Sequence, residues 1–387
     1  MKKLLFILIF TNILTSCRKA DVQPTLIIEC NPVYNSAAHP KNNTFTTLMN
    51  KYIQLGLPGM SILIEDSNGI WVGSAGYADI KNNIAFTPCH ISKGGSITKI
   101  FMGVLFFKLQ EEGAINMEEP ISKYIDNSIL SKIKYSGDMK IKNLLNHTTG
   151  IFDIITSSSF YLAVINNPNK HWEPAELLPY VYGVEPYPLN QPYPARYSST
   201  NTLLLAMCIE KATGRKHHEL LREKILQPLA LNNTYYQGRE TIPTHAAQGY
   251  YDLHNNGTIV NVSNLITGSG NGYTGIFSNV FDYHTFIKAL FVDKTILSQQ
   301  SLDSMLTFVH EDDDYWTGYG AVKKFMNKPA YGIGHTGRDL GYVADLFYFP
   351  DRNIIMAFCV NYGTDGDSFL KPVFLDFESE LVDKLLE

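Results

Sequence analysis

The feature that most constrains this chain is the segment Gly94–Lys99, which reads Gly-Gly-Ser-Ile-Thr-Lys and comes directly before an apolar helical pattern. Apolar residues then recur at helical spacing until Gly113 ends the run: Ile100, Phe101, Val104, Leu105 and Leu109. Ser96 and Lys99 therefore lie on one face of a first helical turn, where backbone N–H groups are unpaired. Because a serine hydroxyl needs a neighbouring base to become a nucleophile, this segment predicts a Ser-Lys catalytic pair.

The spacing Ser-x-x-Lys is not specific alone, since it occurs four times, at Ser16, Ser96, Ser131 and Ser368. Two later triplets distinguish Ser96. Tyr197-Ser198-Ser199 precedes a second apolar helical pattern that stops at Gly214, and His335-Thr336-Gly337 precedes two strand-like runs, 342–349 and 354–360, joined by a turn.

These motifs, in this order, resemble those of the serine β-lactamase and penicillin-recognising D,D-peptidase superfamily, which has S-x-x-K, then Y-x-N or Y-S-x, then K-T-G or H-T-G. The likeness covers roughly residues 45–385 and is closest to the branch of class C β-lactamases, D,D-carboxypeptidases, D-aminopeptidases and related esterases. It implies an α/β fold of the α+β type. An antiparallel sheet built from both chain ends would be flanked by helices, with a helical subdomain inserted at roughly 100–240.

The residue patterns agree with that architecture. Residues 60–66 and 69–77 predict a hairpin around Ser67-Asn68-Gly69. From Ser96 to about 235 the chain is mainly helical, from about 245 it returns to strands, and a last helix is expected at about 368–386. We expect one hydrolase domain over 45–387.

The resemblance also implies roles. Ser96 would attack the substrate carbonyl and carry the acyl group. Either Lys99 or Tyr197 would take its proton, and the order stays open because coupled groups titrate as a unit. The backbone N–H groups of Ser96 and Arg338 would form the oxyanion hole.

Five residues are candidates for substrate binding: Ser199, His335, Thr336, Gly337 and Arg338. Thr336 and Gly337 would offer a strand edge, with Gly337 leaving room for the substrate. The Arg338 side chain could pair with a substrate carboxylate. An unperturbed histidine titrates near about pH 6.5, so His335 predicts a step in activity near neutrality.

The N-terminus reads as a targeting segment. Lys2 and Lys3 precede the apolar run 4–13, and Leu14-Thr15-Ser16-Cys17 resembles a bacterial lipobox. We expect a signal peptide over 1–16, a lipidated Cys17, a flexible tether over 17–44, and an exported lipoprotein anchored to a membrane of the bacterial cell envelope. The alternative is an ordinary secretory signal with a coincidental cysteine.

Composition excludes some partners. The net charge of −5 argues against nucleic acid, and no spaced His/Cys cluster suggests a metal, so no cofactor is expected. The partners are a small-molecule or peptide substrate and a membrane. Cys30, Cys89, Cys208 and Cys359 give no deducible pairing, although the last two lie in apolar runs and read as buried thiols.

The function predicted is hydrolysis through a Ser96 acyl-enzyme, most readily of D-amino-acid-containing peptide or amide bonds, as in a D,D-carboxypeptidase. A carboxylesterase or a class C-like β-lactamase is the alternative, and a non-catalytic penicillin-binding or sensing protein is the alternative of another class. Ser199 stands where lactamases usually have Asn, and His335 where they have Lys, which disfavours a dedicated β-lactamase.

Overall fold

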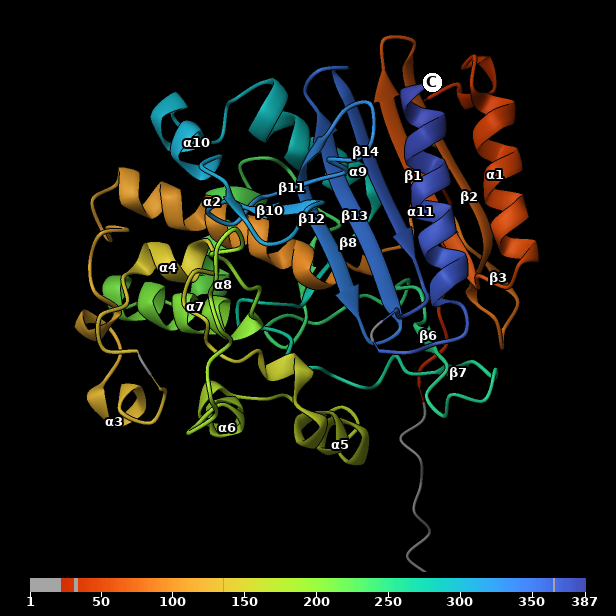
Figure 1. Ribbon diagram of the computed structural model, residues 1–387. Coiled ribbons are helices and arrows are strands. Elements are labelled where there is room, and N and C mark those ends of the chain that lie inside the picture. Colours follow the sequence, from red (N-terminus) through yellow and green to blue (C-terminus); the bar gives the residue numbers. More distant parts are fainter. Residues whose placement is uncertain (1–21, 31–33, 135, 365) are drawn as a thin grey trace, which may run out of the picture.

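The computed structural model describes residues 22–30, 34–134, 136–364 and 366–387 (Figure 1). Over these residues its centre is a nine-stranded antiparallel sheet in the order β3-β2-β1-β14-β13-β12-β11-β10-β9. The strands are β1 (Gly59–Asp66), β2 (Gly69–Asp79), β3 (Ile84–Ala85), β9 (Val309–His310), β10 (Tyr315–Thr317), β11 (Val322–Lys324), β12 (Gly332–Asp339), β13 (Tyr342–Phe349) and β14 (Ile354–Val360). Because β1 pairs with β14, the sheet is built from both ends of the chain, as the family resemblance implies.

Two helices from the chain ends cover one face of this sheet, α1 (Asn42–Gln54) and α11 (Lys371–Leu386), on the right in Figure 1. They pack against each other and bury aromatic rings on the strands. The rings of Phe374 and Phe377 on α11 lie 6.3 and 5.4 Å from that of Phe358 on β14. This core holds the central strands on the face of the sheet that α1 and α11 cover.

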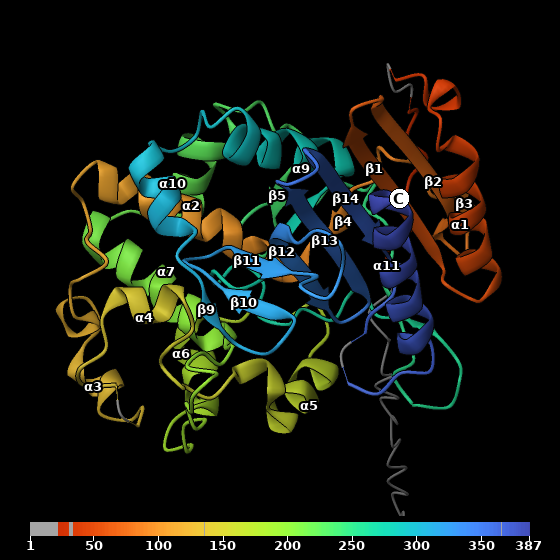
Figure 2. The same cartoon turned by 45° about the horizontal axis from the view of Figure 1, so that its top comes forward.

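The other helices come from the middle of the chain and lie on the opposite side of the sheet (Figure 2). The helices are α2 (Thr98–Glu111), α3 (Asn127–Leu130), α4 (Ile141–Leu145), α5 (Ser158–Asn166), α6 (Pro174–Leu177), α7 (Ser199–Thr213), α8 (His217–Leu221), α9 (Val280–Ile287) and α10 (Gln299–Met305). Short strands form two small sheets: β4 (Ser92–Lys93), β8 (Ile276–Ser278) and β5 (Tyr235–Tyr236), and β6 (Tyr250–Tyr251) with β7 (Val260–Asn261). The inserted helical region of the expected fold is therefore present.

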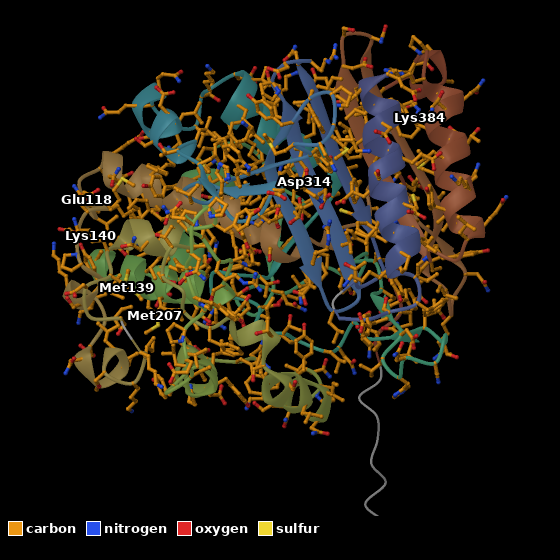
Figure 3. The ribbon with its side chains drawn as sticks, in the orientation of Figure 1. Glu118, Met139, Lys140, Met207, Asp314 and Lys384 are labelled. Atoms are coloured by element: carbon orange, nitrogen blue, oxygen red, sulfur yellow. A yellow bond between two sulfur atoms is a disulfide. The ribbon has the colours of Figure 1, made fainter. Side chains whose placement is uncertain are left out.

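Several single turns of 3-10 or π helix complete the fold. They are η1 (Ser36–Ala38), η2 (Gly95–Ile97), η3 (Ile121–Lys123), η4 (Ile154–Thr156), η5 (Leu178–Tyr180), η6 (Arg222–Leu226) and η7 (Lys288–Val292). Exposed ion pairs lie at the outer edge of the helical region, such as Lys140 with Glu118 at 2.8 Å, both labelled in Figure 3. Such exposed pairs contribute little to stability.

The two predicted apolar helices are α2 and α7, and both are almost wholly buried. Every apolar residue of the pattern after Lys99 lies in the core. Gly214 ends α7 in the left-handed conformation at φ 65°, as its position after the apolar run predicts. The hairpins also form where expected, at 59–79 and 342–360.

The segment expected as a flexible tether is attached to the domain in its described part. Cys30 forms a disulfide with Cys89. The backbone N–H of Thr25 donates to Asp79 at 3.1 Å, and the Thr25 hydroxyl donates to the Ala246 carbonyl at 2.7 Å. The expectation of a free tether is wrong for residues 22–30, because long-range contacts and a covalent bond hold them.

The predicted signal peptide and Cys17 lie outside the described residues. Within those residues, no helix combines the length and the apolar character needed to cross a bilayer. Cys208 and Cys359 are buried thiols, as expected.

Candidate active site

Ser96 and Lys99 lie where β4 turns into η2 and α2, against β12. Glycine is needed on both sides of this contact. A Cβ on Gly95, whose φ is 52°, would meet the Arg338 backbone nitrogen at 2.9 Å, and a Cβ on Gly337 would meet the Gly94 carbonyl oxygen at 1.8 Å. Gly337 thus admits the Ser96 turn rather than the substrate, which corrects the role expected for it.

The Lys99 ammonium is buried and directed at the serine. Its Nζ donates to Ser96 Oγ at 2.9 Å, to the Tyr273 carbonyl at 2.9 Å and to Ser199 Oγ at 3.3 Å. Burial lowers the Lys99 pKa to about 7, against the opposing effect of Asp153. A substantial fraction of Lys99 is therefore neutral near pH 7, as a base for Ser96 must be.

Tyr197 lies beside this pair, just before α7. Its ring stacks on His147 with 4.6 Å between centroids, and Lys99 Nζ is 4.8 Å from the Tyr197 ring centre. Its hydroxyl is buried without a well-formed hydrogen bond to a described residue. Burial raises the Tyr197 pKa well above its usual value, while the Ser96 hydroxyl acts to lower it. Tyr197 is thus protonated and positioned next to Ser96.

Ser199 starts α7 and is fully buried. Its backbone N–H donates to Asp153 Oδ1 at 3.0 Å, while its hydroxyl accepts from Lys99. Ser199 and Ser96 line the same small pocket, together with Tyr273, Thr274 and Arg338. Ser199 therefore lies at the site, in contact with the amine.

His335 and Thr336 are on β12, with the His335 ring centroid 6.2 Å from that of Tyr197. His335 Nδ1 is 2.5 Å from the carbonyl oxygen of Thr336. Burial, reinforced by the charge of Lys99, lowers the His335 pKa to about 3. The expected step near neutrality from His335 is therefore wrong, because the ring stays neutral across that range. Thr336 Oγ1 lies 3.5 Å from the Tyr315 hydroxyl.

The Arg338 side chain points to the other face of the sheet. It binds Asp345 at 2.6 Å and Glu378 of α11 at 2.7 Å. Successive side chains on a strand alternate between faces, so Arg338 is directed away from the face that carries His335. The expectation that its guanidinium pairs with a substrate carboxylate is wrong, although the Arg338 backbone nitrogen lies against Gly95, next to Ser96.

Sequence reasoning missed two carboxyl groups at this site. Asp153 is buried, and burial raises its pKa to about 6 against the effect of Lys99. Glu311 accepts the backbone N–H of Tyr197 at 2.9 Å, and burial raises its pKa to about 7. Neither lies in a catalytic triplet. No motif in the sequence marks Asp153, and its burial beside Lys99 and Ser199 is evident only in the structure.

The described residues hold no group of His, Cys, Asp and Glu side chains arranged to bind a metal. The site therefore brings together a serine at a helix start, an amine of lowered pKa and a buried phenol, beside the strand residue Arg338, which lines the same pocket. This set can carry out acyl transfer through a serine ester.

A sequence model described as Beta-lactamase matches residues 42–375. The chain belongs to the β-lactamase family. It is thus a serine hydrolase by family. Solved structures of the same architecture confirm the expected fold class.

One of these structures is a D-stereospecific amidohydrolase from Streptomyces sp., with a TM-score of 0.75 and 24% identity, covering 86% of this chain and 97% of that one. Another is the D-amino acid amidase from Ochrobactrum anthropi SV3, with a TM-score of 0.74 and 24% identity, covering 89% and 97%. A penicillin binding protein from Bacillus halodurans gives 0.71 and 21%, covering 87% and 98%.

Among curated proteins, this β-lactamase-family chain is similar to the teichoic acid D-alanine hydrolase of Staphylococcus aureus. The two are 29% identical over 233 residues, which is 60% of this chain and 52% of the relative. The chain therefore spans about half the length of the curated relatives it matches.

Proposed function

We propose that this protein hydrolyses amide or ester bonds whose acyl side carries a D-amino acid, through an acyl-enzyme on Ser96. The observation that carries the proposal is the 2.9 Å contact between Ser96 Oγ and a Lys99 amine whose pKa burial lowers to about 7. The stereochemical part rests on the names of the relatives, a D-amino acid amidase and a D-alanine hydrolase.

The proposed steps use the residues described above. Ser96 Oγ attacks the substrate carbonyl while its proton passes to neutral Lys99, and the protonated Tyr197 hydroxyl relays a proton between Lys99 and the leaving group. The backbone N–H groups of Ser96 and Arg338 hold the oxyanion. A proton returned through Lys99 and Tyr197 then releases the amine or alcohol. Water then attacks the ester on Ser96 by the reverse proton path, which restores the free serine.

The test is covalent labelling with a fluorophosphonate and a fluorescent penicillin, then turnover of paired D- and L-aminoacyl amides and esters. We expect label and turnover to be lost in Ser96→Ala and turnover to fall at least about 10²-fold in Tyr197→Phe. An adduct on Ser131 or Ser368 would contradict the nucleophile, and equal rates on both enantiomers would contradict the substrate class.

A carboxylesterase is the second candidate, and Ser199 favours it. A serine hydroxyl makes fewer hydrogen bonds to the acylamide of a substrate than the asparagine amide usual at this position. Simple esters have no acylamide and therefore lose no hydrogen bond. Preference for plain esters over D-aminoacyl amides in the same panel would support it. Rapid penicillin turnover would instead favour a β-lactamase, and labelling without turnover a penicillin-binding protein.

We also propose that the chain is exported and anchored through a lipidated Cys17, on the strength of the sequence over residues 1–17. The test is mass spectrometry of the purified membrane form. We expect the mass of the acyl chains on Cys17 of the wild type. The Cys17→Ala variant should be released from the membrane or remain unprocessed. A soluble mature protein with an unmodified Cys17 would contradict the anchor.

A further inference from the structure

An apolar groove begins beside Ser96 and runs along α5. The small pocket of Ser96 is lined by Ile155 and Tyr161, and the same two residues line an adjoining cavity of about 690 Å³. Leu162, Ile165, Leu253 and Leu340 continue that cavity. Its volume lies in the range of roughly 300–1,000 Å³ that holds small organic ligands.

The described residues lining this groove carry no charged side chain. Leu162 is 60% exposed and Ile165 38% exposed, although α5 already buries Phe160 and Val164 against the core. A short helix that is apolar on its buried face needs no second apolar face for folding. Exposed apolar side chains gathered at a cavity mark a contact with a ligand.

The position of the groove says which part of a substrate it would hold. Arg338 and Asp339 line the Ser96 pocket, and Leu340, the next residue, lines the groove. Tyr197, which would return a proton to the leaving group, is not among the described lining residues of either. The groove, which adjoins the Ser96 pocket and has no Tyr197 in its described lining, is therefore the candidate subsite for the acyl side of the substrate.

We infer that this groove, from Ile155 to Ile165, binds a large apolar side chain on the acyl residue of the substrate, for which alkyl acyl groups serve as probes. The inference rests on the proposed acyl-enzyme of Ser96 and narrows its substrate class.

The test uses p-nitrophenyl esters from acetate to octanoate, which differ only in acyl length. Burial of each methylene favours the longer ester by about two- to fourfold, so kcat/KM should rise at least about tenfold over the series. The double variant Leu162→Glu/Ile165→Glu should remove most of this rise and leave the acetate rate unchanged. The matched control is Leu375→Glu on α11, where Leu375 is 48% exposed; it should behave as wild type.

If kcat/KM does not change with acyl length in the wild type, or if its rise persists in the double variant, the inference about the groove is contradicted. Acetate turnover that depends on Ser96 would still leave the proposed function standing. Binding to Ser96→Ala separates the two further, because it needs no chemistry. Octanamide should bind this variant at least about tenfold tighter than acetamide by calorimetry, and the Leu162→Glu/Ile165→Glu changes should abolish the difference. Equal affinity for both amides would overturn the inference whatever the turnover.

Discussion

At the scale of single residues, the site depends on keeping one amine neutral inside the protein. Lys99 has three hydrogen-bond acceptors and is buried, and burial outweighs the nearby carboxylates in setting its pKa. Burial also lowers the pKa of His335, to about 3. A lysine at position 335 would place a second cation near Lys99, so a neutral histidine leaves Lys99 as the titrating base.

We expect acylation to rise with pH through about 7 as Lys99 loses its proton, and Asp153→Asn to shift this limb to lower pH. The sign follows because the Asp153 charge raises the Lys99 pKa, and its removal lowers that pKa further. Asparagine can still accept the Ser199 N–H, so the plateau at high pH should be retained. The measurement is kcat/KM against pH.

Glu311 has a pKa of about 7 and could produce a limb in the same range. Glu311→Gln is therefore the control, and it should leave the limb of the pH profile where it is. A limb that moves with Glu311→Gln and not with Asp153→Asn would assign the titration to Glu311 and contradict Lys99 as the base.

At the scale of elements, the site is a contact between a helical turn and a strand edge, η2 against β12. Gly337 allows that contact, because its missing Cβ would lie 1.8 Å from the Gly94 carbonyl oxygen. We expect Gly337→Ala to push η2 away from β12 and lower kcat/KM at least about 10²-fold, the scale of a displacement of about 1 Å at a reacting group. Gly137→Ala is the control, since a Cβ there meets nothing within 4 Å. Wild-type kcat/KM in Gly337→Ala would show that the close approach is not required.

What the sequence could predict at this scale is what local spacing determines. The Ser96 turn, α2, α7 and the hairpin after β12 all follow from apolar periodicity and glycine positions within about fifteen residues. Arg338 was misassigned because its orientation depends on Glu378, 40 residues away on α11. Asp153 was missed because its partner Ser199 lies 46 residues away. The disulfide joins cysteines 59 residues apart, which spacing alone cannot pair.

At the scale of the whole molecule, both ends of the chain contribute to one sheet, and the N-terminal segment is fastened to it. The pairing of β1 with β14 joins residues about 300 apart. The Cys30–Cys89 bond closes a loop that contains α1, β1 and β2. Since β3 also lies between the two cysteines, the loop includes one helix of the outer layer and three strands of the sheet, so the bond restricts the unfolded chain across the outer core.

Reducing this disulfide should therefore lower the free energy of unfolding by about 2–4 kcal/mol, since a cross-link acts mainly on the entropy of the unfolded chain. The measurement is chemical denaturation of the wild type with and without reductant, with thiol titration to verify reduction. The double variant Cys30→Ser/Cys89→Ser should have the same free energy of unfolding as the reduced wild type. Reductant should not change that value, because Cys208 and Cys359 are buried thiols. Turnover should persist in the folded variant, since the bond contacts no residue of the Ser96 pocket among those described. Equal midpoints for oxidised and reduced wild type would mean that the contacts of Thr25 hold the segment without the covalent bond.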